Sequence, residues 1–234
     1  MVAQYLFERY LMTNLNSSAK KTPKNPIRFL VNLNEEQKQA KQVILNNKIT
    51  VIKGQAGSGK SLVAAQVALD LLFRREVEKV ILTRPAVTSG EEIGFLPGSK
   101  EDKLAPYTAA IYDNMYRLYN KEKIDKCVLE GQIEVIPLAF MRGRNLTNCC
   151  VVVDEGQNIT HRQMELLLGR ICKDTKMIIC GDIQQIDLKD KKISGFNFIC
   201  TNFKEVPGFE VVVLKTNHRD PIVEKILEIY KAHD

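Results

Sequence analysis

The sequence predicts an α/β protein with a mostly parallel sheet that is covered by helices on both faces. Three observations support this prediction. Short apolar or β-branched runs alternate with stretches of helical periodicity from about residue 34 onward. A glycine-rich segment separates the first such run from a long helical pattern. Polar residues follow directly after two further runs. In a parallel sheet, these residues would meet at the carboxyl edge, where ligands bind.

The expected elements can be placed in chain order. Asn34 can cap a first helix that runs through Gln37 toward Leu45. A strand at 49–52 follows, and then a helix from Lys60 to about Arg75, in which leucine and alanine recur at helical spacing. The remaining apolar runs predict strands at 80–82, 133–136, 150–153, 177–180 and 211–214, and the helical patterns between and after them cover 107–119, 162–171 and 222–230.

The chain of 234 residues is expected to hold one main domain, residues 26–234, preceded by an extension over residues 1–25. Residues 17–26 are polar and basic and contain two prolines, which is typical of a linker. The sequence contains no apolar run of about 20 residues. The N-terminus also lacks the core of a signal peptide, so a cytoplasmic location is expected.

Charge and cysteine usage exclude some classes of function. The net charge of +6 favours polyanionic partners only mildly. The six cysteines form no C-x-x-C pair and only three histidines are present, which argues against a zinc site. A catalytic thiol is also disfavoured, because no histidine lies in a recognisable partner motif. Cys149 and Cys180 lie within apolar strands and are expected to be buried, reduced thiols.

The glycine-rich segment matches the phosphate-binding pattern G-x-x-x-x-G-K-S in full, between a strand and a helix. Its glycines let backbone N–H groups curl around phosphate oxygens, and the helix N-terminus favours negative charge there. Lys60 should reach the β- and γ-phosphates of a bound nucleoside triphosphate, and Ser61 should offer its hydroxyl to Mg²⁺. The predicted phosphate-binding residues are Gly54, Gln55, Ala56, Gly57, Ser58, Gly59, Lys60 and Ser61.

An acidic pair follows the predicted strand at 150–153. Asp154 can hold Mg²⁺, and Glu155 can accept a proton from an attacking water as general base. The alternative is a solvated turn after a buried strand, which the phosphate-binding loop upstream makes less plausible. The strand at 177–180 also ends in polar residues, where Gln185 is the candidate for sensing the γ-phosphate and Gln184 is close to it on chemistry alone.

The order GQAGSGKS, DEGQN and GDIQQ resembles the RecA-like core of superfamily 1 helicases and, more specifically, the PhoH family of P-loop ATPases. The resemblance covers about residues 34–230, and the short form is similar to PhoH-like proteins of bacteriophages. Two glycines depart from the family pattern: Gly156 stands where alanine is usual, and Gly169 where threonine is usual. The stretches that carry the specific resemblance are 83–87, 90–98, 103–107, 137–144 and 184–188.

The resemblance implies a RecA-type fold and hydrolysis of ATP with Mg²⁺. It also implies that Gln37, in a segment similar to the helicase Q motif, recognises the adenine edge with its amide. Arg219 lies in a segment that resembles the helicase motif whose arginine contacts the γ-phosphate, which makes it a candidate transition-state cation. The alternative for Arg219 is a surface residue at a helix start before Pro221.

Three arginines lie on loops after predicted strands: Arg84, Arg142 and Arg144. They are candidates for contacts with nucleic-acid phosphates or with a nucleotide in a neighbouring subunit, the alternative being ordinary surface ion pairs. Gly143 between the last two is expected to permit a close backbone approach. The chain has no tryptophan and few aromatic residues, so a stacking platform for bases is not expected.

The leading function is an ATP-dependent motor or remodeller that acts on RNA or single-stranded DNA. Two-domain helicases bind ATP between two RecA-like lobes, and this chain has length for one. A head-to-tail ring, which the resemblance suggests is a hexamer, would let a neighbouring subunit supply the missing wall. The alternatives are a small-molecule kinase and a nucleotide-dependent switch or scaffold with weak hydrolysis.

Overall fold

A computed structural model describes residues 27–85 and 111–231. The proposed extension over residues 1–25, and the stretches 90–98 and 103–107, lie outside these residues. Six strands form one sheet in the order β3-β2-β4-β5-β1-β6, and every neighbouring pair is parallel. The strands are β1 (Ile49–Gly54), β2 (Lys79–Thr83), β3 (Ile133–Val135), β4 (Cys149–Val153), β5 (Lys176–Gly181) and β6 (Phe209–Leu214).

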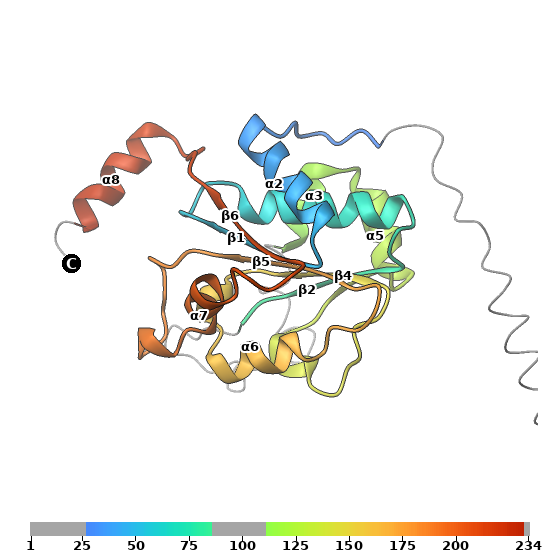
Figure 1. Cartoon of the computed structure of the whole chain (residues 1–234). Helices are drawn as coiled ribbons and strands as arrows, with labels where there is room; N and C mark the ends of the chain where they lie inside the picture. Colours follow the sequence, from blue (N-terminus) through green and yellow to red (C-terminus); the bar gives the residue numbers. More distant parts are fainter. Residues whose placement is uncertain (1–26, 86–110, 232–234) are drawn as a thin grey trace, which may run out of the picture.

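Helices cover both faces of the sheet, as predicted. Figure 1 shows α2, α3 and α5 on one face and α6 and α7 on the other. The α-helices with full bounds are α2 (Glu35–Asn46), α3 (Lys60–Phe73), α5 (Lys121–Leu129), α6 (His161–Leu168), α7 (Gly195–Asn202) and α8 (Pro221–Lys231). Short 3-10 helices are η2 (Leu138–Met141), η3 (Gly156–Asn158) and η4 (Lys191–Ile193). No helix in the described ranges is long and apolar enough to cross a bilayer.

The predicted elements are confirmed to within a few residues at their ends. Asn34 caps α2 in a capping box, in which its side chain accepts from the Gln37 N–H and Gln37 accepts from the Asn34 N–H. Of the helix expected at 107–119, the structure describes residues 111–118 as helical. The sequence prediction missed α5 and α7, which are short and begin at side-chain caps from Asn120 and Ser194.

Two apolar layers fill the space between the sheet and its helices. One lies under α2, α3 and α5 and is built around the central helix α3, in which residues 63–72 are all buried. The other lies under α6 and α7, where β4 and β5 contribute their remaining side chains. The central strand β4 is buried along its whole length. Continuous burial of this kind is expected for a parallel strand that has helices on both faces.

A charged group is buried within α3. The Asp70 side chain is 3% exposed and accepts from Lys41 Nζ at 2.6 Å and from Arg74 Nε at 2.7 Å. Two cations therefore compensate the charge of this buried carboxylate. An aspartate without such partners would be costly to bury in a core. The Lys41 bond also ties α2 to the C-terminal end of α3.

Phe196 of α7 packs directly beneath two glycines at the carboxyl edge of the sheet. A Cβ added to Gly181 would lie 2.6 Å from the tip of the Phe196 ring. A Cβ added to Gly156 would lie 3.0 Å from the same ring and 2.8 Å from Ile179 Cγ2. Gly156, where the resemblance leads one to expect alanine, therefore leaves room for a large buried ring.

We predict that Gly156→Ala lowers the free energy of unfolding by about 1–3 kcal/mol, because the added methyl overpacks a stiff, buried site. Phe196→Leu should recover part of this loss in the double variant, since the two side chains share one space. Denaturant unfolding of the single and double variants measures the coupling. Gly169→Ala is the matched control, because its Cβ would lie 3.3 Å or more from its neighbours. Fully additive losses would contradict this packing account.

Candidate nucleotide-binding site

The phosphate-binding loop joins β1 to α3 with the geometry that its sequence predicts. Gly57 and Gly59 have positive φ angles of 90° and 83°, which favour glycine. Gly54 is also constrained, because a Cβ there would lie 2.6 Å from the Leu214 carbonyl oxygen of β6. The N-terminus of α3 begins at Lys60, directly after the loop, where backbone N–H groups and the helix dipole favour an anion.

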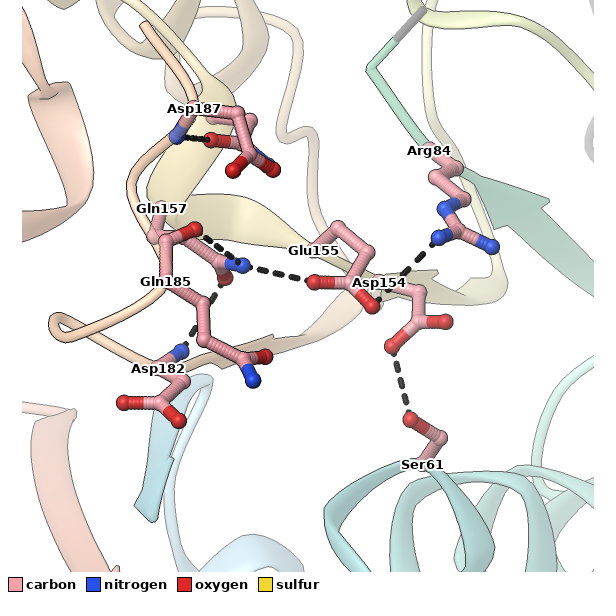
Figure 2. Close-up of polar contacts among 9 residues, drawn as sticks. Ser61, Arg84, Asp154, Glu155, Gln157, Asp182, Gln185 and Asp187 are labelled. Carbon is pink, nitrogen blue, oxygen red and sulfur yellow. Dashed lines mark hydrogen bonds and ion pairs between the residues drawn. The ribbon is translucent and has the colours of Figure 1, made fainter. Parts of the chain in front are cut away.

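Lys60, Ser61 and Asp154 meet beside this loop. Lys60 Nζ donates to the carbonyl oxygens of Gly54 at 2.8 Å and Gln55 at 2.9 Å, which holds the ammonium across the loop. Ser61 Oγ donates to Asp154 Oδ1 at 2.7 Å (Figure 2). The two predicted Mg²⁺ ligands therefore lie next to each other, although they come from α3 and from the end of β4. Hydroxyl and carboxylate oxygens suit Mg²⁺, which keeps waters and binds substrate phosphates in its remaining positions.

Glu155 lies at the tip of β4, with its backbone in the left-handed region at φ 51° and ψ 40°. Such a conformation costs energy for a residue with a side chain and clusters at functional sites. Both carboxylate oxygens are engaged: Arg84 Nη2 lies 3.4 Å from Oε1, and Gln157 Nε2 donates to Oε2 at 2.6 Å (Figure 2). About one third of the side chain remains exposed toward the cleft.

The loop after β5 braces the phosphate-binding loop and carries Gln185 to the same place. Asp182 is buried, and its Oδ2 accepts from the Ala56 N–H at 3.1 Å. Its Oδ1 accepts from the Gln184 N–H at 3.0 Å. Gln185 lines the same cleft as Lys60, and Gln184 is not among its lining residues. The structure thus favours Gln185 over Gln184 as the residue that faces a bound triphosphate.

The segment after β6 folds back over the phosphate-binding loop. The His218 N–H donates to the Gly57 carbonyl at 3.0 Å, and Arg219 packs so closely that a Cβ on Gly57 would lie 2.7 Å from its Cγ. Glu36 of α2 holds this segment, since its carboxylate accepts the backbone N–H groups of Lys215 and Thr216 at 2.7 and 3.1 Å. These bonds, led by the one from Lys215, lower the pKa of Glu36.

Gln37 lies at the rim of the loop, where its amide already has partners. Its Nε2 lies 3.4 Å from the Ser58 carbonyl oxygen and 3.3 Å from His218 Nε2, and its carbonyl caps α2. The residue lines the cleft but is 4% exposed. Its predicted recognition of adenine would therefore require the amide to exchange some of these bonds.

A cleft of about 600 Å³ joins all these groups. This volume lies in the range of small-molecule and cofactor sites. Its walls include the phosphate-binding loop, the acidic strand end, Gln185 and the His218–Arg219 pair. The arrangement can hold a polyphosphate at the helix N-terminus and place an oxygen base beside it.

Comparison with known proteins agrees with this arrangement. The family model described as PhoH-like protein matches residues 30–231. The chain belongs to the PhoH family. It is 42% identical over 200 residues to a PhoH-like protein of Synechocystis sp., covering 85% of this chain and 61% of that protein. It is 40% identical to a PhoH-like protein of Bacillus subtilis, covering 76% of this chain and 56% of that protein.

Protein PhoH of Escherichia coli is 35% identical over 74% of this chain and 49% of its own length. The chain thus spans about half to three fifths of the length of these three relatives. Among solved structures, the UvsW helicase of bacteriophage T4 has a TM-score of 0.50 at 15% identity, covering 88% of this chain and 67% of that chain. This likeness concerns the fold, and together with the family match it confirms the predicted RecA-like architecture.

The three loop arginines of this PhoH-family chain do not form one cluster. Arg84 reaches Glu155 in the site. Arg144 donates from Nη1 to Glu134 Oε2 at 3.1 Å near the β3 edge, and neither it nor the exposed Arg142 lines the cleft. Arg144 therefore makes the surface ion pair that was its alternative interpretation. Nothing lies within 4 Å of the Cβ position of Gly143, and its φ of 76° favours glycine, so the close approach expected there stays a prediction.

Several residues of the site were missed by the sequence analysis. Gln157 and Asp182 sit inside the quoted motifs but were given no role, although their buried polar side chains connect strand ends. Arg117 and Asn114 come from the helix at 111–118 and line the cleft opposite the acidic pair. No local motif marks these two, because only the packing of that helix against α3 brings them to the site.

The cysteines take no part in this chemistry. All six are free thiols, and Cys149, Cys150 and Cys180 are buried in strands. Burial raises the pKa of Cys149, raises that of Cys150 to about 12 and raises that of Cys180 well above its usual value, so these thiols stay protonated. Within the described ranges, no group of three or more His, Cys, Asp or Glu side chains is placed to hold a metal ion.

We predict that Glu36→Gln weakens binding of a fluorescent ATP analogue about 3- to 10-fold, because a charged acceptor that fixes the Lys215–Arg219 segment is replaced by a neutral one. Titration of fluorescence measures the dissociation constant. Glu35→Gln is the matched control, since Glu35 bonds only Lys38 on the surface. The pKa of Glu36 is lowered in the folded chain. The stabilisation that its carboxylate gives to this segment is therefore complete at neutral pH and is lost as the pH falls through the lowered pKa. Equal affinities of the two variants for the analogue would contradict this role of Glu36.

Proposed function

We propose that this chain is a Mg²⁺-dependent ATPase whose hydrolysis is coupled to RNA or single-stranded DNA. The observation that carries the proposal is the position of Glu155, which reaches into the same cleft as Lys60, Ser61 and Asp154. A triphosphate held at the helix N-terminus would present its γ-phosphate to a carboxylate that can activate water.

The proposed reaction is attack of water on the γ-phosphorus. The bond from the water oxygen to phosphorus forms, the bond from phosphorus to the β,γ-bridging oxygen breaks, and Glu155 takes the water proton. Mg²⁺, held by Ser61 and Asp154, would neutralise charge on the phosphates. Lys60 would exchange its two carbonyl partners for phosphate oxygens. Arg219 would add a second cation in the transition state, and Gln185 would orient the water or the γ-phosphate.

Coupling to a nucleic acid is supported by the family and by charge. The chain carries a net charge of +6, and Arg84 connects the end of β2 to the catalytic carboxylate. A polyanion at that strand end would compete with Glu155 for the guanidinium. The absence of tryptophan favours recognition of the sugar–phosphate backbone over base stacking.

The decisive assay is phosphate release from ATP with Mg²⁺, measured with and without single-stranded RNA and DNA. We expect hydrolysis that polynucleotide stimulates, and Glu155→Gln should lose about 100-fold or more of turnover while it still binds an ATP analogue. Wild-type turnover in Glu155→Gln would overturn the base assignment. A rate that no polynucleotide changes would contradict the coupling and favour a switch or scaffold. Release that depends on a small acceptor would indicate a kinase.

We also propose that subunits assemble head to tail into a ring, with six as the expected number. The helix α8 supports self-association: it extends from β6 beyond the body of the molecule in Figure 1, and its apolar side chains are exposed. Isolated helices of this length are marginal in water, so α8 gains from a partner surface. The exposed apolar side chains are Ile222, Val223, Ile226, Ile229 and Tyr230.

Light scattering with and without an ATP analogue tests the ring. We expect a hexamer under at least one condition and a smaller species for Ile226→Asp, which places a charge in the apolar stripe. Lys225→Asp on the same helix lies outside the stripe and is the control. A monomer under every condition would contradict the ring.

A further inference from the structure

Gln157 is a buried amide whose hydrogen-bonding groups are all engaged. It is 1% exposed. Its Oε1 accepts from the Asp182 N–H at 3.0 Å. Its Nε2 donates to Glu155 Oε2 at 2.6 Å and to the Gln185 carbonyl at 3.1 Å. Because the Asp182 N–H can only donate, it fixes the amide orientation and turns the Nε2 group toward Glu155. Figure 2 shows this side chain between Glu155, which follows β4, and the loop after β5 that carries Asp182 and Gln185.

The neighbouring residue Asn158 shows which part of this network is structural. Asn158 Nδ2 donates to Asp187 Oδ2 at 3.1 Å, and Asn158 Oδ1 accepts from the Asp187 N–H at 2.8 Å. This side-chain bridge also ties η3 to the loop after β5, and it includes no bond to the Glu155 carboxylate. The attachment of the two loops therefore has a second bridge, whereas the donor aimed at the carboxylate comes from Gln157.

We propose that Gln157 is a positioning residue for Glu155 that also links this carboxylate to the loop carrying Gln185. This inference rests on the proposed hydrolysis of ATP. A glutamate side chain has several rotatable bonds, and one short bond from a buried, fixed amide restricts them. Movement of the Asp182–Gln185 loop would be passed to Glu155 through one rigid amide.

Hydrogen bonds connect the phosphate-binding loop to Glu155 through Asp182 and Gln157. Asp182 accepts from the Ala56 N–H of the phosphate-binding loop and donates its own N–H to Gln157. Asp182 is therefore the single residue that connects Gln157 to that loop by hydrogen bonds. The bonded path runs from Ala56 through Asp182 and Gln157 to Glu155. A phosphate that displaces the loop would therefore change the position of the base.

The test compares Gln157→Glu with Asn158→Asp in the full chain. Gln157→Glu keeps the length and an acceptor for Asp182, and it places a second carboxylate beside Glu155. The donor to Glu155 Oε2 is thereby replaced by an acceptor, which cannot hold the carboxylate in place. We expect kcat at pH 7 to fall about 10- to 100-fold, with KM for ATP changed less than about 3-fold.

Asn158→Asp makes the same chemical change in the neighbouring bridge, and it should lower kcat less than about 3-fold because the donor to the Glu155 carboxylate is kept. The other charged or titratable groups near Glu155 are the same in both variants, so the comparison isolates the Gln157 contact. These groups are Lys60, Arg84, Arg117, Asp154, Asp182, His218 and Arg219. A wild-type kcat in Gln157→Glu, or an equal loss of kcat in Asn158→Asp, would overturn the proposal.

A second variant covers the case in which Gln157→Glu does not fold. Gln157→Met keeps the length and removes both donors without adding charge. It should lower kcat about 10- to 100-fold while affinity for an ATP analogue stays near that of the wild type. A wild-type kcat in Gln157→Met would overturn the positioning role. Absence of turnover in the wild-type chain is seen before any variant is measured, and it contradicts the proposed function itself.

Discussion

The parallel pairing of β4, β5 and β1 fixes where the functional groups can meet. Val153 pairs with Ile179, and Lys53 pairs with Gly181, so these three strands end close together at one edge of the sheet. Each strand then continues into a polar loop: Asp154–Glu155 after β4, Asp182–Gln185 after β5 and the phosphate-binding loop after β1. A shift of one residue in either register would move each side chain to the opposite face of the sheet and into the other apolar layer, so the packing on both faces holds the site in place.

Buried polar side chains then connect the loops at this edge. Asp182 links the phosphate-binding loop to β5, and Gln157 and Asn158 link β5 to the acidic strand end. Each of these groups would be costly inside the protein without its partners. Since their partners lie on different strands, the groups are satisfied only when the strands are paired correctly. Folding and assembly of the site therefore depend on the same bonds.

Much of the fold could be predicted from sequence, because its signals are local. The β-branched run before the glycine-rich loop and the leucine spacing after it identify β1 and α3, and Asn34 marks the start of α2. α7 could not be found in this way, because its Phe196 packs under Gly156 and Gly181. These glycines belong to other elements, so no local pattern marks the helix. Ser61 and Asp154 were predicted as a pair because both belong to known motif positions. Gln157 was missed because its role arises from contacts across two strand ends.

The loop arginines likewise depend on contacts between elements that local sequence does not reveal. Sequence placed Arg84, Arg142 and Arg144 in one class of loop cations, since each follows a predicted strand. The strand order separates them: β2 lies next to β4, which brings Arg84 to Glu155, while Arg144 pairs with Glu134 at the β3 edge. Arg117 has no motif and reaches the cleft from a helix. Which cation faces the nucleotide thus depends on topology, which the sequence analysis did not resolve.

We propose that the edge formed by β1, β4 and β5 holds and cleaves a triphosphate. A crystal structure with Mg²⁺ and a non-hydrolysable ATP analogue tests it most directly. The account predicts phosphates at the N-terminus of α3, Lys60 Nζ moved from the Gly54 and Gln55 carbonyls to phosphate oxygens, and a metal ion between Ser61 and Asp154. A nucleotide bound elsewhere, or bound here with the Ser61–Asp154 and Lys60 bonds unchanged, would contradict the account.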